Sequence, residues 1–222
     1  MAGDVESEKR LAAEAAAALV PDGARVGLGT GSTVAHLLPA LARRGLRLRC
    51  VATSPATERL ARELGLAVEP FASLDRLDIA IDGADQVAPG GWLVKGGGGA
   101  HTREKVVAAA AERFVVIVSS DKVVEALEPP VPVEILAYGA AATLRALAPA
   151  RLRPGTPPSP DGGLIADWLG AVGNPAALAT RLAATPGVVE HGLFPPALVS
   201  EVLVARGGTV ERQAGSRTPS SA

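Results

Sequence analysis

The sequence is poor in cysteine and aromatic residues and has no excess of charge of either sign. Its one cysteine, Cys50, can form neither an internal disulfide nor a cysteine metal cluster. The formal net charge of −1 and a pI near 6.3 give no electrostatic reason to expect a nucleic acid as partner. These features predict a protein of a reducing compartment, and we expect a cytoplasmic location.

Long hydrophobic runs are also missing. The N-terminal segment MAGDVESEKR is charged and lacks the apolar core of a signal peptide, and the apolar runs are far shorter than a membrane span. We therefore expect neither secretion nor membrane insertion. Hydrophobic residues nevertheless make up 48% of the 222 residues, which is ample for the core of one large domain or two small ones.

Apolar strand patterns alternate with helical patterns through the first 120 residues. The helical spacing of apolar residues predicts helices at 8–20, 32–45, 55–65 and 103–113. The short apolar runs predict strands at 24–29, 48–54, 78–85 and 114–120. This alternation predicts an α/β fold with a Rossmann-like parallel sheet, helices on both of its faces, and ligands at the carboxyl ends of its strands.

The pattern changes after about Leu127, where EPPVPVEILAYG carries three prolines. We predict a second, smaller α+β domain over 128–196, with 1–127 and 197–222 forming the Rossmann-like catalytic domain. The segment 197–212 is predicted to be a last strand that returns to the first domain. The tail from about 213, QAGSRTPSSA, is polar and has no apolar period, so we expect it to be disordered.

The first loop with unusual chemistry is GLGTGST, Gly27–Thr33, which follows a predicted strand. Its glycines let the backbone approach an anion, and the N-terminus of the next helix adds a favourable dipole. It has neither the lysine of a Walker loop nor the third glycine of the dinucleotide fingerprint. Tight packing of strand against helix is the alternative explanation, but the hydroxyls of Thr30, Ser32 and Thr33 favour phosphate binding.

The second loop is TSPAT, Thr53–Thr57. A hydroxyl that accepts a backbone N–H and a proline at the first helical position are the usual start of a helix. We therefore interpret this loop as a helix cap, which does not exclude a second role in binding.

The third loop is DGAD, Asp82–Asp85, at the end of a predicted strand. Aspartates that bond their own backbone explain most such turns. Two carboxylates at a strand end can instead share the hydroxyls of a sugar or act as acid and base. No histidine or third carboxylate lies at ligand spacing, so we predict no metal site.

The fourth loop lies in LVKGGGGAHTREK, residues 93–105. Each glycine costs roughly 0.5–1 kcal/mol relative to alanine in regular structure, so the run is either a slack linker or a close approach to a ligand. Glu104, in the first turn of the next predicted helix, ordinarily complements the helix dipole. With Lys95 before the glycines, it can also serve as a general base beside an oxyanion site. The neighbouring anion-suited loops favour this catalytic interpretation.

Lys122, in SSDKVVEAL, follows the predicted strand 114–120 at what we take to be a helix start. A lysine there opposes the helix dipole, so it either meets an anion or is a solvated surface residue.

Taken together, these loops resemble the type A ribose-5-phosphate isomerase family. The matching segments are GLGTGSTVAHLL, ATSPATERLARELG, DIAIDGADQV, LVKGGGGAHTREKVVA, VSSDKVVEAL, PVPVEIL and GVVEHGLF, and they extend to about residue 205. The resemblance implies a homodimeric, metal-independent and cofactor-free enzyme of the non-oxidative pentose phosphate pathway. Its small-molecule substrate would be a sugar phosphate, D-ribose 5-phosphate or D-ribulose 5-phosphate.

The resemblance also implies a role for each matching residue. Glu104 would be the base that moves a proton between C1 and C2 through an enediolate. Asp82 and Asp85 would contact the sugar hydroxyls and assist ring opening, and Lys95 would polarise the reacting oxygens as the remaining catalytic residue. Lys122, and with it Lys9, would reach the phosphate. The substrate-binding residues implied are Thr30, Gly31, Ser32, Thr33, Asp82, Gly83, Ala84, Asp85, Lys95, Gly96, Gly97, Gly98 and Lys122.

The sequence departs from the family pattern at three places. His101 stands where an apolar residue is usual, His191 stands where asparagine is common, and PGTPPSPDGGLIADW, residues 154–168, replaces a threonine–aspartate–asparagine–glycine–asparagine turn. A lone histidine is more often structural than catalytic, so we assign neither histidine a role. Because of the third departure, the sequence does not predict whether the hairpin of the small domain forms.

Three alternative functions are compatible with single features. A sugar-phosphate sensor of the same fold would need a DNA-binding module, which neither the net charge nor the N-terminus offers. A nicotinamide-dependent dehydrogenase would use the first loop, but the strand 48–54 ends in hydroxyls where an acidic ribose-binding residue is required. A coenzyme A transferase would use Glu104 as a nucleophile.

Overall fold

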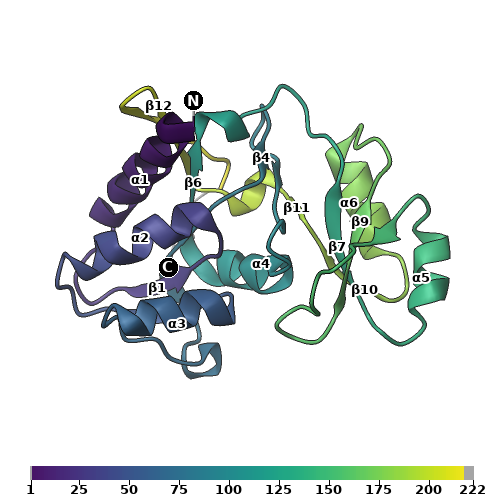
Figure 1. The fold of residues 1–222 in the computed structure, drawn as a ribbon, viewed down its shortest axis with the longest axis horizontal. Helices are drawn as coiled ribbons and strands as arrows, with labels where there is room; N and C mark the ends of the chain where they lie inside the picture. Colours follow the sequence, from purple (N-terminus) through teal and green to yellow (C-terminus); the bar gives the residue numbers. More distant parts are fainter. Residues whose placement is uncertain (1, 218–222) are drawn as a thin grey trace. The chain divides into compact units, whose positions relative to one another are not determined.

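Residues 2–217 are described by the computed structural model, and they form two compact units (Figure 1). The first unit contains the residues up to Ala84, Arg103–Val123 and the residues from Pro196 onward, and the second contains Asp85–Thr102 and Val124–Pro195. The expected small domain, 128–196, lies almost wholly within the second unit. Residues 85–102, expected in the first domain, also belong to the second unit, because their strands pair there.

A six-stranded sheet forms the centre of the first unit. Its strands, in spatial order, are β13 (Thr209–Ala214), β12 (Glu201–Arg206), β6 (Ala111–Ser119), β3 (Leu77–Asp82), β1 (Arg25–Leu28) and β2 (Arg49–Ala52). Neighbouring strands are parallel except for β12 and β13, which form an antiparallel pair. The expected parallel sheet is confirmed, whereas the single last strand expected at 197–212 is a hairpin.

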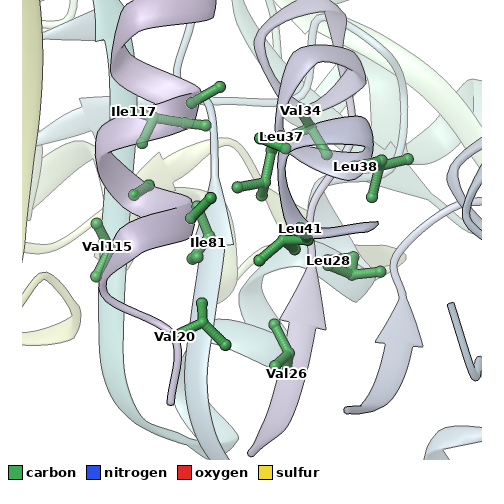
Figure 2. Packing of buried hydrophobic residues seen from close by; sticks show 14 of the residues in the cluster. Val20, Val26, Leu28, Val34, Leu37, Leu38, Leu41, Ile81, Val115 and Ile117 are labelled. Atoms are coloured by element: carbon green, nitrogen blue, oxygen red, sulfur yellow. The ribbon is translucent and has the colours of Figure 1, made fainter. Parts of the chain in front are cut away.

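One face of this sheet packs against α1 (Ala2–Ala18) and α2 (Ser32–Ala42). Figure 2 shows side chains of α2 directed toward strand residues that include Val26, Leu28 and Ile81, and the buried alanines of α1 belong to the same core. The buried alanines of α1 carry small side chains, so this helix can approach the sheet closely. The buried alanines of α1 therefore serve helix packing.

The opposite face carries α4 (His101–Ala110), as Gly27 demonstrates. Gly27 lies between Val26 and Leu28 and points to the other side of the sheet, where an added Cβ would lie 2.4 Å from Val107 of α4. Tight strand–helix packing is therefore the correct explanation for this first glycine of the GLGTGST loop. Between β2 and β3 the chain forms α3 (Pro55–Glu63) and the short 3-10 helix η1 (Phe71–Ser73).

The disorder expected from residue 213 is wrong for the described part of the tail. Gln213 and Ala214 belong to β13 and pair with Val202 and Glu201 of β12. The guanidinium of Arg217 donates hydrogen bonds to backbone carbonyls in the last turn of α4. Strand pairing and helix capping hold this polar segment, which has no apolar pattern of its own. Residues 218–222, where the expectation continues, lie outside the described residues.

The second unit contains two smaller sheets. The four-stranded sheet is antiparallel, with the order β10 (Val188–His191), β7 (Val131–Ile135), β9 (Leu164–Trp168) and β8 (Arg151–Leu152). The three-stranded sheet has the order β11 (Leu193–Phe194), β5 (Leu93–Val94) and β4 (Gln86–Val87). The helices of this unit are α5 (Ala140–Ala146) and α6 (Pro175–Ala183). Its core joins Leu178 and Leu182 of α6 to buried residues of the strands, which agrees with the expected α+β class.

The divergent segment 154–168 forms a closed hairpin. Arg151 and Leu152 of β8 pair with Asp167 and Ala166 of β9, and the N–H of Ser159 donates to the carbonyl of Gly163 at 2.8 Å. The turn without the family's usual residues is thus a paired one. Between residues 2 and 217, no helix is long and apolar enough to cross a membrane.

Candidate active site

The carboxylate of Asp82 lies against the first glycine loop. Because β1 and β3 are parallel neighbours in which Leu28 pairs with Ile81, the residues that follow the two strands meet at the same sheet edge. Asp82 Oδ1 accepts hydrogen bonds from the N–H groups of Thr30, at 3.0 Å, and Gly83, at 2.7 Å. Asp82 is only 3% exposed. The backbone of the loop therefore fixes the orientation of the Asp82 carboxylate.

Hydroxyl groups from the TSPAT loop support the same strand ends. The Oγ1 atoms of Thr30 and Thr53 lie 2.7 Å apart, and Thr57 Oγ1 donates to the carbonyl of Gly29 at 2.8 Å. Ser54 Oγ accepts the N–H of Thr57 at 3.2 Å, and Pro55 is the first residue of α3. The predicted helix cap is confirmed, and it also holds the backbone of the first glycine loop.

The helix α2 begins directly after this loop. Gly31 is its N-cap residue, with φ of 115°, a conformation that favours glycine, and Ser32 and Thr33 open the helix. Ser32 is exposed and Thr33 is partly exposed. An eleven-residue helix whose N-terminus presents hydroxyl residues is suited to hold an anion.

Glu104 lies in the first turn of α4, as predicted, because the helix begins at His101. Its side chain is buried, with 4% of the residue exposed. His101 is fully buried, and its Nε2 lies 3.3 Å from the carbonyl oxygen of Glu190. The other unusual histidine, His191, accepts the N–H of Leu193 through Nδ1 at 3.3 Å. Both histidines thus contact backbone groups near β10.

Lys122 does not stand at the start of an α-helix, which corrects the sequence-based expectation. It ends the three-residue 3-10 helix η2 (Ser120–Lys122), and its Nζ lies 3.2 Å from Asp121 Oδ2. The side chain is 38% exposed. Lys122 therefore does not oppose the dipole of an α-helix. Its ammonium is accessible, which allows it to bind an anion.

Glu8 is a residue that the sequence did not single out. It is 4% exposed, and its carboxylate accepts the N–H and the hydroxyl of Ser120, both at 2.8 Å, and the N–H of Gly207 at 3.1 Å. Glu8 thereby fixes the start of η2 and, with it, the backbone that carries Lys122. Its neighbour Lys9 forms an ion pair with Glu6 at 2.6 Å. Glu8 directly precedes Lys9, for which the resemblance implied a role. Only the fold reveals the three hydrogen bonds that Glu8 accepts from Ser120 and Gly207.

In the second unit, the run of four glycines forms a tight turn. The N–H of Gly99 donates to the carbonyl of Gly96 at 3.0 Å, and these two residues have φ of 71° and 102°. The N–H of Gly97 donates to Asp85 Oδ2 at 2.8 Å. An added Cβ on Gly97 would lie 2.7 Å from Asp85 Oδ1. The run is therefore an ordered loop that brings the backbone N–H of Gly97 to a carboxylate, and the slack-linker alternative is wrong.

Lys95 connects β5 to the glycine run. Its N–H donates to the carbonyl of Gly192 at 2.8 Å, which fixes the backbone. Its side chain is buried, with 3% of the residue exposed, and Nζ lies 5.4 Å from the centre of the Phe194 ring. Phe194 belongs to the segment GVVEHGLF, for which the sequence predicted no role in the site. Its ring contacts the Lys95 ammonium.

The expected site residues divide between the two units. Those of the first unit are Thr30, Gly31, Ser32, Thr33, Asp82, Gly83, Ala84, Glu104 and Lys122, and those of the second are Asp85, Lys95, Gly96, Gly97 and Gly98. Gly83 and Ala84 are partly exposed, and Gly97 and Gly98 are exposed. Within residues 2–217, no group of three or more histidine, cysteine, aspartate or glutamate side chains is arranged to hold a metal ion.

The chain is similar to proteins of one family over most of its length. The family described as Ribose 5-phosphate isomerase A (phosphoriboisomerase A) matches residues 49–208. The curated relatives include Ribose-5-phosphate isomerase A of Caulobacter sp. (strain K31), which is 44% identical over 203 residues, covering 85% of this chain and 90% of the relative. The relative of the same name from Natronomonas pharaonis is 44% identical over 220 residues, covering 91% and 94%.

Solved structures agree with this similarity. Ribose 5-phosphate isomerase A from Methanocaldococcus jannaschii has a TM-score of 0.89 and 34% sequence identity, with 94% of this chain and 99% of that chain covered. A D-ribose-5-phosphate isomerase described in complex with phospho-erythronic acid has a TM-score of 0.89 and 32% identity, covering 95% and 99%. Both the sequence match and the fold identify the chain as a member of the ribose 5-phosphate isomerase A family.

Proposed function

We propose that this protein interconverts D-ribose 5-phosphate and D-ribulose 5-phosphate through an enediolate. One observation carries the proposal: in a chain of this family, the buried carboxylate of Glu104 stands in the first turn of α4, directly after the glycine run. The matched relatives are named for this aldose–ketose isomerisation, which belongs to the non-oxidative pentose phosphate pathway. None of the comparisons favours a sensor function.

Glu104 acts as the base in this proposal. It takes the proton from C2 of the open-chain aldose, which leaves an enediolate across C1 and C2, and it returns a proton to C1 to give the ketose. Burial removes water from the carboxylate, and the N-terminal turn of α4 places backbone N–H groups beside it. The proton that leaves the O2 hydroxyl is balanced by a proton delivered to O1, so the product is an isomer of the substrate.

Asp82 and Asp85 serve the hydroxyl groups of the sugar in this proposal. Asp82 is held by the N–H groups of Thr30 and Gly83, and Asp85 by the N–H of Gly97, so the orientation of each carboxylate toward a hydroxyl is fixed by the backbone. Both assist ring opening and the transfer of protons between oxygens. Gly83 and Ala84 lie between the two aspartates and bind the substrate through their backbone.

Lys95 and Gly96–Gly98 stabilise the negative charge that develops on O1 and O2. A buried ammonium and oriented backbone N–H groups are strong electrostatic stabilisers because little water screens them. Thr30–Thr33 at the N-terminus of α2, together with Lys122, hold the phosphate, and Lys9 contributes as a further cation. The reaction needs no cofactor or metal ion in this proposal.

We further propose that the protein is a cytoplasmic homodimer. Burial, assisted by the nearby Glu69 carboxylate, raises the pKa of the Cys50 thiol to about 12, which makes this cysteine unreactive at neutral pH. The feature that supports a reducing compartment is the single cysteine, which leaves no internal disulfide. Light scattering during size-exclusion chromatography measures the mass in solution, and a mass near one chain of 22.4 kDa would contradict the dimer.

The isomerisation is tested by mixing the protein with D-ribose 5-phosphate in D₂O that contains EDTA and following the products by ¹H NMR. We expect ribulose 5-phosphate to form despite the chelator and to carry deuterium at C1, because the proton held by Glu104 exchanges with solvent. Ribulose 5-phosphate that gains no deuterium even after prolonged incubation, over many reversible turnovers, would count against the enediolate route. Absence of product in the presence of bound substrate would instead revive the sensor function.

Phospho-erythronic acid supplies a binding measurement that does not depend on turnover. One solved relative is described in complex with this compound. We propose that this chain binds it too, because a phosphorylated sugar acid offers a phosphate at one end and a carboxylate at the other. Isothermal titration calorimetry therefore reports on the binding groups even in a variant without activity.

A further inference from the structure

Arg153 grips the backbone of the glycine run. Its Nη1 donates hydrogen bonds to the carbonyl oxygens of Gly97, at 2.9 Å, and Gly96, at 3.2 Å. The arginine follows β8, and its side chain is only 18% exposed. All three residues belong to the second unit. A side chain from the hairpin thus binds two successive peptide groups of the loop that precedes α4.

The charge of this arginine is compensated by Asp167 of β9. Nε donates to Asp167 Oδ2 at 2.9 Å and Nη2 to Oδ1 at 2.6 Å, so the two groups form a bidentate pair. This pairing, with a smaller effect from Asp85, raises the pKa of Arg153 above its ordinary value. Because the aspartate neutralises the guanidinium and fixes its plane, the contribution of Arg153 to the loop is directional.

The geometry of the peptide bond transmits this direction to the other side of the loop. In a planar trans peptide the C=O and the N–H point in opposite directions. The carbonyl of Gly96 faces Arg153, so the N–H of Gly97, in the same peptide group, points away from it and reaches Asp85 at 2.8 Å. The carbonyl of Gly97 also faces Arg153, which turns the N–H of Gly98 away from the guanidinium.

A run of glycines needs contacts from outside the run to keep its peptide groups in one orientation. A glycine populates positive and negative φ about equally, so four in succession can rotate their peptide groups at little cost. Gly97 and Gly98 are exposed, and neither is held by side-chain packing of its own. The turn from Gly99 to Gly96 closes the loop and orients the carbonyl of Gly96, but it does not orient the middle peptide group, which consists of the carbonyl of Gly97 and the N–H of Gly98.

We propose that Arg153 is a positioning residue that sets the peptide orientation of Gly96–Gly98, so that the loop presents its N–H groups on the side of Asp85. This inference rests on the proposed function, in which the N–H of Gly97 holds Asp85 and the N–H of Gly98, turned to the same side, stabilises the enediolate. In this proposal Arg153 has no contact with the reacting atoms or the phosphate, because its guanidinium is directed to Asp167 and the two carbonyls. Its loss therefore affects the transition state more than the binding of the ground state.

The test compares Arg153→Lys with Arg151→Lys. A lysine keeps the charge but has no rigid fork, so it cannot bind Asp167 bidentately while holding two carbonyls. We expect the kcat of Arg153→Lys to fall about 10- to 100-fold, with KM within about threefold of the wild type. Arg151 is an exposed arginine on the adjacent strand β8, and its replacement by lysine should leave both constants unchanged.

Hydrogen exchange of the backbone gives a readout that is independent of activity. Mass spectrometry of peptides that cover 93–100 should show faster exchange in Arg153→Lys than in the wild type, because the Gly97 N–H loses its fixed direction toward Asp85. In addition, millimolar guanidinium should restore part of the activity of Arg153→Ala. Such rescue requires the hydrogen bonds of the planar cation and would not repair a general folding defect.

The outcomes separate this inference from the proposed function. An inactive wild type would contradict the function, while the exchange measurement would still decide whether Arg153 orients the loop. An active wild type with unchanged kcat and exchange in Arg153→Lys would overturn the inference. If Arg153→Lys does not fold, Asp167→Asn is the substitute variant, because it weakens the bidentate pair that orients the guanidinium. Reduced kcat with faster exchange at 93–100 in this variant would support the inference. Wild-type values of both would overturn it.

Discussion

Gly29 lies so close to Asp82 that no other residue can occupy its position without displacing the aspartate. A Cβ added at Gly29 would lie 2.0 Å from the carboxyl carbon of Asp82, whose side chain is buried. We therefore expect Gly29→Ala to move this carboxylate and to lower kcat by at least about 10²-fold, since catalytic groups tolerate displacements of only a fraction of an ångström. Steady-state kinetics measure this effect.

Gly83→Ala is the stability control for this variant. A Cβ at Gly83 would meet only the carbonyl of Ile117, at 3.8 Å, which is an ordinary contact. Overpacking at Gly29 should lower the free energy of unfolding by about 1–3 kcal/mol, whereas Gly83→Ala should change it little. Urea denaturation of both variants gives the comparison, and equal stability would mean that Asp82 can retreat without cost.

Glu104→Gln should remove the base while preserving the shape of the site. General base catalysis contributes about 10²–10⁴-fold, so we expect kcat to fall by at least that factor with substrate affinity largely kept. Calorimetry with phospho-erythronic acid should report binding within severalfold of the wild type. Glu63→Gln, an exposed glutamate at the end of α3, is the matched control. Near-normal turnover of Glu104→Gln would show that another group is the base.

Much of this arrangement follows from local sequence patterns. The alternation of apolar strands with helical spacing predicts the parallel sheet, and the rule that ligands bind at its carboxyl edge brings Thr30 and Asp82 to one place. The position of Glu104 in the first turn of α4 could also be predicted, because the helical pattern begins shortly after a run of glycines, which are unfavourable inside a strand. These features depend on residues that are close in the chain or on a general rule of sheet topology.

The remaining features depend on contacts between distant residues. The strands β4 and β5 have two residues each, too few for an apolar period, so 85–102 could not be assigned to the second unit. The polar strand β13 is held by pairing with β12 and by the packing of Val210 against the core. Arg153 and Glu8 act on backbone groups more than 50 and 100 residues away, and no local pattern marks a side chain whose partners are carbonyl or N–H groups.

Lys122→Ala should weaken the binding of the phosphate group. The ammonium is 38% exposed beside Asp121, so it can turn toward an incoming anion. We expect KM to rise about tenfold with kcat within about threefold, because the phosphate is bound equally in the ground state and the transition state. Inorganic phosphate should also inhibit the variant less than the wild type. Arg59→Ala, which removes an exposed cation from α3, controls for net charge. Loss of kcat alone would count against a phosphate contact.

Glu8 should stabilise the fold at neutral pH and lose this effect in acid. Burial by itself would raise the pKa of Glu8, but hydrogen bonds from Ser120 and Gly207 and the charge of Arg206 outweigh it and hold the pKa below its ordinary value. A carboxylate with a lowered folded-state pKa stabilises the protein above its unfolded pKa, near 4.3, and this contribution disappears as the pH falls through the folded value.

Glu8→Gln tests this dependence, because the amide keeps the size of the side chain but not the charge. At pH 7 we expect the variant to lose about 1–3 kcal/mol of unfolding free energy, the range for hydrogen bonds to a charged group. The difference from the wild type should shrink as the pH is lowered below about 4. Glu14 lies on the same helix as Glu8 and forms an exposed ion pair with Arg43. Glu14→Gln should change the free energy of unfolding by less than about 1 kcal/mol at either pH. A gap between Glu8→Gln and the wild type that stays constant with pH would mean that the packing of Glu8, and not its charge, stabilises this corner of the sheet.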